Sequence, residues 1–158
     1  MNLVRTLEPC KRFFCYHRIV IVSEEDSKLI EIAKSLVKEE RIPGGVVGEV
    51  GAVMRTSEGE VFSGVCMHLV CGIGFCAEHT AIATAVTRKS NIQIDTIVAV
   101  NKNGIIPPCG RCRELMNVLS ENGSNTWIIL DDNEKVQLAD LLPRAWLPRR
   151  SSTERPEA

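Results

Sequence analysis

Two short cysteine-bearing runs constrain the fold of this chain more than any other feature of its sequence. The first is Phe75-Cys76-Ala77-Glu78-His79, and the second is Pro107-Pro108-Cys109-Gly110-Arg111-Cys112-Arg113. Together they supply three thiols and one carboxylate, and no other part of the sequence offers a comparable group of reactive side chains. Each run stands at the start of a predicted helix, so a chain that uses these groups together must bring two helix N-termini to one point.

The residue types in these runs are those of a catalytic zinc site. Zinc prefers tetrahedral thiolate or imidazole ligands, and a catalytic site takes three ligands from the protein and leaves the fourth position to water. Cys109 and Cys112 are three residues apart at a helix start, so both sulfur atoms can face one point, and Cys76 heads the other helix. Free N–H groups at helix N-termini stabilise thiolates. We therefore predict that Cys76, Cys109 and Cys112 bind Zn²⁺.

Glu78 is the predicted proton carrier of this site. It follows Cys76 by two positions, so it can reach a metal-bound water from the same helical turn without serving as a ligand. Zinc lowers the pKa of bound water toward neutrality, and Glu78 would take a proton from that water and pass it to a leaving amine. Three thiolates on a zinc dication leave one net negative charge, which Arg111 and Arg113 are placed to offset. The alternative for these two arginines is a solvent-facing position on the helix.

Length and composition favour one soluble domain in a reducing compartment. The chain has 158 residues, of which 25% are charged and 44% are apolar, so it can bury a core without disulfide support. Its seven cysteines are an odd number, and together with the Cys-Gly-Arg-Cys run they favour metal binding by reduced thiols. The apolar stretches near the N-terminus are too short for a signal peptide or a membrane span. We therefore expect a cytoplasmic protein that does not enter a membrane.

Helical and strand patterns alternate after an opening hairpin and predict a three-layer α-β-α sandwich around one mixed, five-stranded sheet. The expected elements, in chain order, are a helix from Ser23 to near Glu40, strands over residues 46–54 and 61–67, a helix from about Cys76 to Lys89, a strand over 96–100, a helix over 109–119, a strand over 126–130 and a short helix over 137–142.

The same patterns divide the chain into three parts. Residues 1–22 lack a clear period, and we expect them to form an N-terminal extension that adds a short strand or a packing segment. Residues 23–147 form the predicted zinc domain. Residues 148–158 are polar and of mixed charge, and we expect them to be a disordered tail.

The two cysteine-bearing runs resemble the cytidine deaminase superfamily, whose pattern is Cys-Ala-Glu followed by Pro-Cys-Gly-x-Cys-Arg. The resemblance extends from about Glu24 to Trp146 and is to the free-nucleoside branch, which includes cytidine deaminase and blasticidin S deaminase. It implies the family fold, usually assembled as a homotetramer with sites completed by neighbouring subunits. It also implies a zinc-dependent hydrolytic deaminase that releases ammonia from a cytosine-type nucleoside, such as cytidine or deoxycytidine, or from a related aminopyrimidine metabolite such as blasticidin S.

The resemblance implies four substrate contacts. The family carries Asn-x-Glu on a strand, where the two side chains hold sugar hydroxyls, and Cys66 and His68 stand at these positions. Trp146 stands where relatives place an aromatic residue that covers the substrate, often in a neighbouring subunit's site, and Ala77 is the remaining contact. The alternatives are a small core side chain for Cys66, a histidine at a strand end for His68 and a packing role for Trp146.

Some positions depart from the family pattern. A cysteine is a poor partner for a hydroxyl, so Cys66 makes ordinary cytidine a doubtful substrate. The stacking phenylalanine of the family is replaced by Gly48, which removes one wall of the expected pocket. The arginine that follows Cys-Ala-Glu in many relatives is His79 here, so more of the charge compensation at zinc would fall to Arg111 and Arg113.

Two other functions fit parts of the pattern. A binding module with a structural zinc is one, but a closed structural site has no use for Glu78. A deaminase of bases within nucleic acid is the other, and it needs a cationic groove for a flipped or single-stranded base. The net charge of −1 gives no such attraction, and relatives of that kind more often have histidine in the first ligand position, where Cys76 stands here. We expect a small-molecule substrate.

Overall fold

Strand β3 (Gly45–Thr56) is the longest element of the sheet, and its two edges place the neighbouring strands. The computed structural model describes residues 20–146. Strand β4 (Val61–Leu69) pairs antiparallel with one edge of β3, and β5 (Ile94–Asn101) pairs antiparallel with the other edge. Valine-rich sequence favours the extended backbone of these strands. The predicted hairpin of residues 46–54 and 61–67 is thus confirmed.

The remaining strands extend the sheet and make it mixed. Strand β7 (Trp127–Ile129) pairs parallel with β5, and β8 (Glu134–Gln137) pairs antiparallel with β7. Three short strands complete the sheet: β1 (Val20–Ile21) on β8, β2 (Glu40–Ile42) on the first residues of β3, and β6 (Gly104–Ile106) on the end of β5. The described part of the chain therefore contributes eight strands and not the expected five. The three that the pattern did not predict, β2, β6 and β8, are too short or too polar to give a strand signal.

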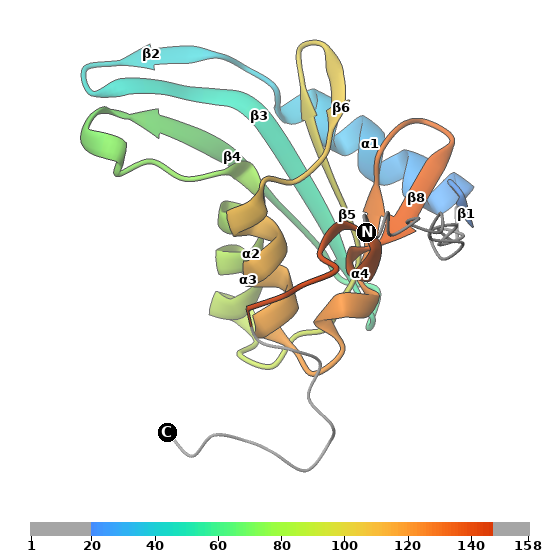
Figure 1. The fold of residues 1–158 in the computed structure, drawn as a ribbon. Helices are drawn as coiled ribbons and strands as arrows, with labels where there is room; N and C mark the ends of the chain where they lie inside the picture. The colour runs from blue at the N-terminus through green and yellow to red at the C-terminus, as the bar shows by residue number, and fades with distance from the viewer. Residues whose placement is uncertain (1–19, 147–158) are drawn as a thin grey trace, which may run out of the picture.

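Helices cover both faces of the sheet (Figure 1). Helix α1 (Glu24–Leu36) packs on one face, while α2 (Ala77–Arg88), α3 (Gly110–Leu119) and the single-turn α4 (Leu138–Leu141) pack on the other. Two short 3₁₀ turns, η1 (Val70–Gly72) and η2 (Gly123–Asn125), lead into α2 and β7. The three-layer α-β-α architecture and the helices expected at Cys76 and Cys109 are confirmed.

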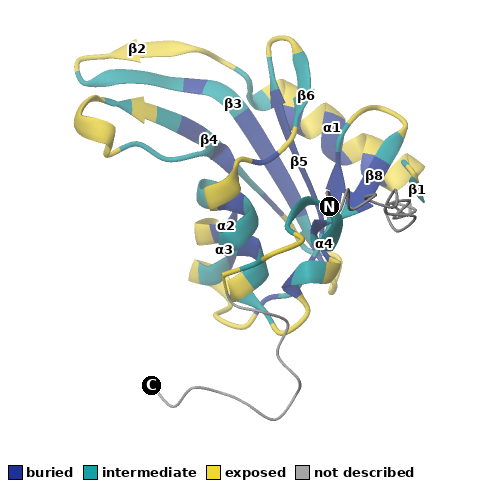
Figure 2. Ribbon diagram, in the orientation of Figure 1, coloured by how far each residue is buried: buried dark blue, intermediate teal, exposed yellow. Residues whose placement is uncertain are grey.

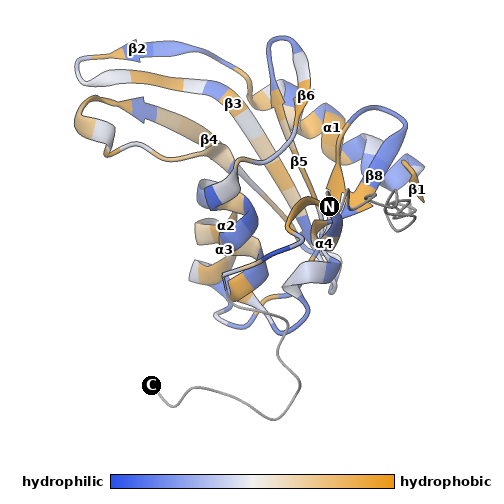
Figure 3. Cartoon of the chain, in the orientation of Figure 1, coloured by the Kyte–Doolittle hydropathy of each residue, from blue (hydrophilic) through white to orange (hydrophobic). Residues whose placement is uncertain are grey.

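Alternation along the central strands divides the core between the two faces, because successive side chains of a strand point to opposite sides. Val53 and Val98 pack against α1, whereas their neighbours Met54 and Ile97 pack against α2 and α3. Figure 2 shows the buried residues concentrated in these central strands. In Figure 3, β5 is drawn mostly in the hydrophobic colour, while hydrophilic residues gather at the turn between β7 and β8.

Two glycines let the helices lie unusually close to the sheet. A Cβ atom on Gly51 would lie 2.6 Å from the carbonyl oxygen of Ala33 in α1, and one on Gly64 would lie 2.5 Å from the backbone nitrogen of Ala81 in α2. Such distances exclude any side chain at either position. The approach of α2 to β4 at Gly64 fixes the depth at which the first turn of α2 meets the sheet.

The first helix is shorter than the sequence predicts. It ends at Leu36 and not near Glu40, because Val37 is extended and the Lys38 N–H donates to the Gly48 carbonyl oxygen at 3.0 Å. Pairing with β3 thus competes successfully with a further helical turn. Residues 1–19 and 147–158 lie outside the described range, so the predictions of an N-terminal extension and a disordered tail stay predictions. Among residues 20–146, no helix combines the length and the apolar character that a membrane span requires.

A buried carboxylate, Asp26, ties three elements together. It lies in the first turn of α1, where it forms a reciprocal capping box with Ser23. Its side chain is fully buried and accepts hydrogen bonds from Lys135 of β8 and from Arg55 of β3, the latter at 3.0 Å. Burial alone raises the pKa of Asp26, but the hydrogen bonds from Lys135 and Ser23 favour the carboxylate and hold that pKa below its ordinary 3.8.

We predict that Asp26→Asn lowers the free energy of unfolding by about 3 kcal/mol at pH 7, because Lys135 is left buried without a counter-charge. Since the pKa of Asp26 is lower in the folded state, its contribution is complete above the unfolded pKa and is lost as pH falls through the folded pKa. The difference between wild type and variant should therefore shrink below about pH 4. Urea unfolding from pH 3 to pH 7 measures it. The exposed pair Glu31–Lys34 offers a control, because Glu31→Gln should change stability by less than about 0.5 kcal/mol.

Candidate active site

Two helix N-termini converge at the cysteine-bearing runs. Cys76 is the N-cap of α2, Cys109 is the N-cap of α3, and Cys112 lies in the first turn of α3. Neither cap makes the usual side-chain hydrogen bond to its own helix. The first N–H groups of each helix are therefore left for other acceptors, and the backbone N–H groups of Cys112 and Arg111 act on the Cys109 thiol so as to lower its pKa.

Local contacts hold each cap in place. Before α2, Phe75 forms an isolated bridge with Met67 of β4, with N–H to carbonyl distances of 3.0 Å and 2.9 Å. Before α3, the Arg113 side chain donates from Nε to the Pro108 carbonyl oxygen at 2.8 Å. Cys76 and Cys109 thus follow residues whose backbones are fixed by the sheet or by the next helix.

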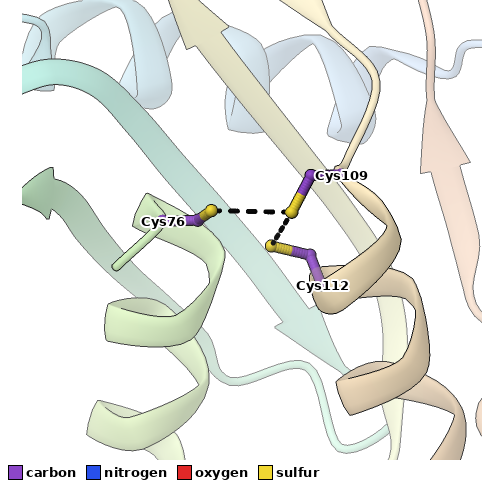
Figure 4. A group of neighbouring side chains, drawn as sticks. All are labelled: Cys76, Cys109 and Cys112. Atoms are coloured by element: carbon purple, nitrogen blue, oxygen red, sulfur yellow. Dashed lines mark hydrogen bonds between the residues drawn. The ribbon is translucent and has the colours of Figure 1, made fainter. Parts of the chain in front are cut away.

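The three sulfur atoms form a compact triangle (Figure 4). The Sγ atoms of Cys76 and Cys109 are 3.6 Å apart, those of Cys109 and Cys112 are 3.4 Å apart, and all three lie within 4.8 Å of one another. Three thiolates bound to one zinc at about 2.3 Å with tetrahedral angles would lie about 3.8 Å apart. The donor set and its spacing therefore fit a zinc ion, with Cys112 fully buried beneath it and Cys109 exposed on the open side.

The thiols differ in how readily they lose their protons. Burial raises the pKa of Cys112, and burial together with the hydrogen bond that Cys76 donates to Cys109 raises the pKa of Cys76. Burial also acts to raise the pKa of Cys109, but the Cys112 backbone N–H and the hydrogen bonds among the three thiols leave that pKa lowered. Cys109 is thus the thiol of the three that loses its proton most readily, and a bound dication would supply the charge that the thiolates of Cys76 and Cys112 need.

Glu78 lies in the first turn of α2 beside this cluster. It is only 4% exposed, and its negative charge acts on both Cys76 and Cys112. No side chain or backbone group of residues 20–146 donates a hydrogen bond to its carboxylate. A buried carboxylate next to a metal-binding cluster and without a hydrogen-bond donor is free to exchange protons with a bound ligand.

Of the expected substrate contacts, two are buried in the core and the others are exposed. Ala77 and Cys66 are buried in one cluster with Ala52 and Ala99, and the Cys66 sulfur accepts a hydrogen bond from the Val50 N–H at 3.2 Å. His68 is exposed and pairs through Nδ1 with Glu49.

The His68–Glu49 pair lies on one wall of a surface cavity of about 180 Å³, which Glu39, Val50 and Asn101 also line. Trp146 is 80% exposed, and its backbone N–H donates to Glu114 of α3 at 3.0 Å. The Trp146 side chain therefore lies largely in solvent and not in the core.

The arginines expected to offset charge at zinc are not equivalent. Arg111 is exposed. Arg113 donates to the carbonyl oxygens of Pro108 and Leu141, the latter at 2.9 Å, so its guanidinium joins the cysteine loop to the end of α4. The side chain that does reach a sulfur atom is His79, whose Nδ1 is 3.5 Å from Cys112 Sγ. Burial lowers the pKa of His79, and the charge of Arg111 lowers it further. One sequence signal for this contact is the spacing Cys76-x-x-His79, which matches Cys109-x-x-Cys112.

This geometry has counterparts among known proteins. A family model described as the cytidine and deoxycytidylate deaminase zinc-binding region matches residues 23–123, a range that includes all three cysteines and Glu78. The chain belongs to this family. Its relatives include blasticidin-S deaminase of Bacillus cereus, 30% identical over 135 residues, which cover 77% of this chain and 92% of that protein. Cytidine deaminase of Halalkalibacterium halodurans is 27% identical over 101 residues, covering 62% and 76% respectively.

Solved structures of the deaminase family have the same fold. The cytidine deaminase from Burkholderia pseudomallei has a TM-score of 0.63 at 30% identity, with 76% of this chain and 98% of that chain covered. The enzyme from Mycobacterium tuberculosis has a TM-score of 0.64 at 25% identity, with 76% and 95% covered. Membership in the family confirms three predictions: the resemblance itself, zinc as the cofactor, and a zinc-dependent hydrolytic deaminase as the class of enzyme.

We predict that Cys109→Ser lowers zinc affinity on the order of 100-fold or more, because a neutral hydroxyl replaces one of three thiolates. Metal analysis after dialysis against a chelator measures this loss. Cys71→Ser is the matched control, since Cys71 is exposed and lies outside the sulfur triangle. A full zinc content in the Cys109 variant would mean that the ligand set is different.

Proposed function

We propose that the protein hydrolyses the bond between the ring carbon and the exocyclic amine of a small aminopyrimidine nucleoside or related metabolite, and so releases ammonia. The observation that carries the proposal is Glu78, a buried carboxylate beside three clustered thiols. Cys76, Cys109 and Cys112 are the proposed zinc ligands, and Glu78 is the proposed catalytic residue. The deaminase names of the family and of its relatives support the reaction class.

The open coordination of the cluster favours a catalytic zinc over a structural one. A structural site uses four protein ligands. Among the described residues, the three cysteines form the only group of three or more ligand atoms that all lie within 4.8 Å of one another, so no fourth side chain completes a tetrahedron. Glu78 lies in the first turn behind Cys76 and is buried, which suits a proton carrier and not a solvated surface group.

Each residue has a defined task in this reaction. The three thiolates hold the metal, which when bound supplies a Lewis acid that makes a water molecule nucleophilic near neutral pH. Glu78 accepts a proton from the attacking water, donates it to the ring nitrogen beside the amine-bearing carbon, and carries the second proton to the departing amine. A C–O bond forms, the C–N bond breaks, and the products are a carbonyl compound and ammonia.

We expect the protein to bind the part of the substrate remote from the amine differently from the way the family binds ribose. The Cys66 sulfur is buried and accepts an N–H hydrogen bond, so it has little to offer a sugar hydroxyl. His68 is exposed, lies two residues along the same strand face, and presents its ring together with Glu49 to the cavity of about 180 Å³. We propose that His68 and Glu49 contact this part of the substrate and that ordinary cytidine is not favoured.

The exposed Trp146 supports an assembly in which a neighbour uses it. A tryptophan ring that is 80% exposed, on a backbone tethered to Glu114, offers a large apolar surface to another molecule. We propose that it covers the substrate in the site of a neighbouring subunit within a homotetramer. We also propose a cytoplasmic location, since the zinc site requires reduced thiols.

The proposed role of Glu78 predicts that Glu78→Gln abolishes ammonia release, with kcat lowered by at least about 10³-fold, while zinc content and fold are retained. Ammonia detection, metal analysis and circular dichroism on the same sample separate these effects. Glu58→Gln is the control, because Glu58 is exposed in the β3–β4 turn region and pairs with Lys89. Unchanged turnover in the Glu78 variant would remove this residue from the mechanism.

The proposed specificity predicts unequal rates across a panel of cytidine, deoxycytidine, cytosine, blasticidin S and aminopurines, with cytidine below the best substrate. For that best substrate, Glu49→Gln should raise KM about tenfold with a smaller change in kcat, because Glu49 contacts a part of the substrate that does not react. Steady-state ammonia release measures both. Cytidine turnover equal to that of every other compound would contradict the proposed role of Cys66 and His68.

A further inference from the structure

His79 occupies a position that mirrors one of the proposed zinc ligands. Helix α2 begins Cys76-Ala77-Glu78-His79, and α3 begins Cys109-Gly110-Arg111-Cys112. Each helix thus has one chemistry-bearing side chain at its N-cap and a second one three residues later. Positions three apart lie on the same side of a helix. Three of these four side chains form the sulfur triangle, and the fourth, His79, is the one that is not a cysteine.

The geometry excludes His79 as a fourth ligand in this structure. A ring nitrogen that completed a tetrahedral site would lie about 3.6 Å from every sulfur atom. The Nδ1 of His79 is 3.5 Å from Cys112 Sγ, but no nitrogen of this ring lies within 4.8 Å of all three sulfur atoms. The contact is therefore with one ligand and not with the centre of the cluster.

We propose that His79 donates a hydrogen bond from Nδ1 to the Cys112 thiolate and so positions this ligand and withdraws charge from it. The contact suits this role, since Cys112 is fully buried and cannot be solvated by water, while His79 is half-buried against it. A neutral imidazole protonated at Nδ1 is sufficient as the donor.

No other basic side chain near the cluster is arranged to do the same. Arg113 donates to the carbonyl oxygens of Pro108 and Leu141, and Arg111 is exposed. Within residues 20–146, His79 is the one basic side chain that contacts a sulfur of the triangle. Three thiolates and a zinc dication carry a net charge of −1, and a hydrogen bond to one sulfur reduces the electron density that this ligand gives to the metal. His79 is a positioning residue and acts through Cys112.

The test compares three substitutions in full-length protein loaded with Zn²⁺ or Co²⁺. His79→Asn keeps an N–H donor close to the position of Nδ1, His79→Gln moves the donor toward the position of Nε2, and His79→Leu removes it. We expect His79→Leu and His79→Gln to lose zinc to a chelator about 10- to 100-fold more readily than wild type, with His79→Asn within about threefold of wild type. The sulfur-to-cobalt charge-transfer band of the Co²⁺ form should shift in the same two variants, while the intensity of tetrahedral d–d bands stays that of wild type.

Two outcomes overturn the proposal. If all three variants match wild type in chelator resistance and in the charge-transfer band, His79 has only a packing role. If all three, including His79→Asn, lose the tetrahedral d–d intensity, His79 is a metal ligand. Because His79→Gln retains a polar side chain of similar size, it keeps the test valid where His79→Leu fails to fold. None of these measurements depends on the substrate, so a failure of the proposed reaction would be seen separately in ammonia release.

Discussion

The meeting of two helix N-termini over one sheet is the constraint on which the site depends. Helices α2 and α3 both begin with a cysteine that makes no side-chain cap, and the N-terminal ends of both helices lie at the cluster of three sulfur atoms. The depth of α2 is set by Gly64, where no Cβ fits beneath Ala81, and its start is fixed by the bridge between Phe75 and Met67. The sulfur spacings of 3.4 Å and 3.6 Å therefore follow from how the fold places the two helix starts.

The charges of the site follow from that meeting. Three thiols and the Glu78 carboxylate share one small volume, and burial favours protons on Cys76 and Cys112. A bound divalent cation would reverse this preference, because its charge stabilises the buried thiolates and offsets the free-energy cost of their desolvation. What remains is one excess negative charge, which the helix N-termini and the His79 contact reduce. The buried carboxylate can then exchange protons without competing as a ligand.

Sequence reasoning predicted the parts of this protein that depend on local pattern. The two helix starts and the hairpin follow from spacing and periodicity within a few neighbouring residues. The three layers follow from the order of these elements, and the cysteine triangle was predicted from the chemistry that zinc requires of Cys76, Cys109 and Cys112. Strand β2 could not be found this way, because Glu40, Arg41 and Ile42 become extended only by pairing with β3.

Side-chain contacts between residues far apart in the sequence could not be predicted from local pattern either. Arg113 looked like a charge partner of zinc from its position in the run, but its hydrogen-bond acceptors are the carbonyl oxygens of Pro108 and Leu141, one of them far along the chain. The exposure of Trp146 and the pairing of Glu49 with His68 likewise depend on how separate elements pack.

The departures from the family pattern form one physical unit. Between Val47 and Gly51 the register of β3 against β4 shifts, so residues 48–50 of β3 lie opposite Cys66 alone. Gly48 has a φ of +76°, and a Cβ there would lie 2.1 Å from the Lys38 carbonyl oxygen, so no phenylalanine can occupy this position. The irregularity leaves the Val50 N–H to donate to the Cys66 sulfur, so this cysteine satisfies a backbone group that the β3–β4 ladder does not pair. It also lets Glu49 reach His68 across the bulge. Restoring a phenylalanine at Gly48 would therefore disrupt the local backbone and would not by itself restore a sugar-binding wall.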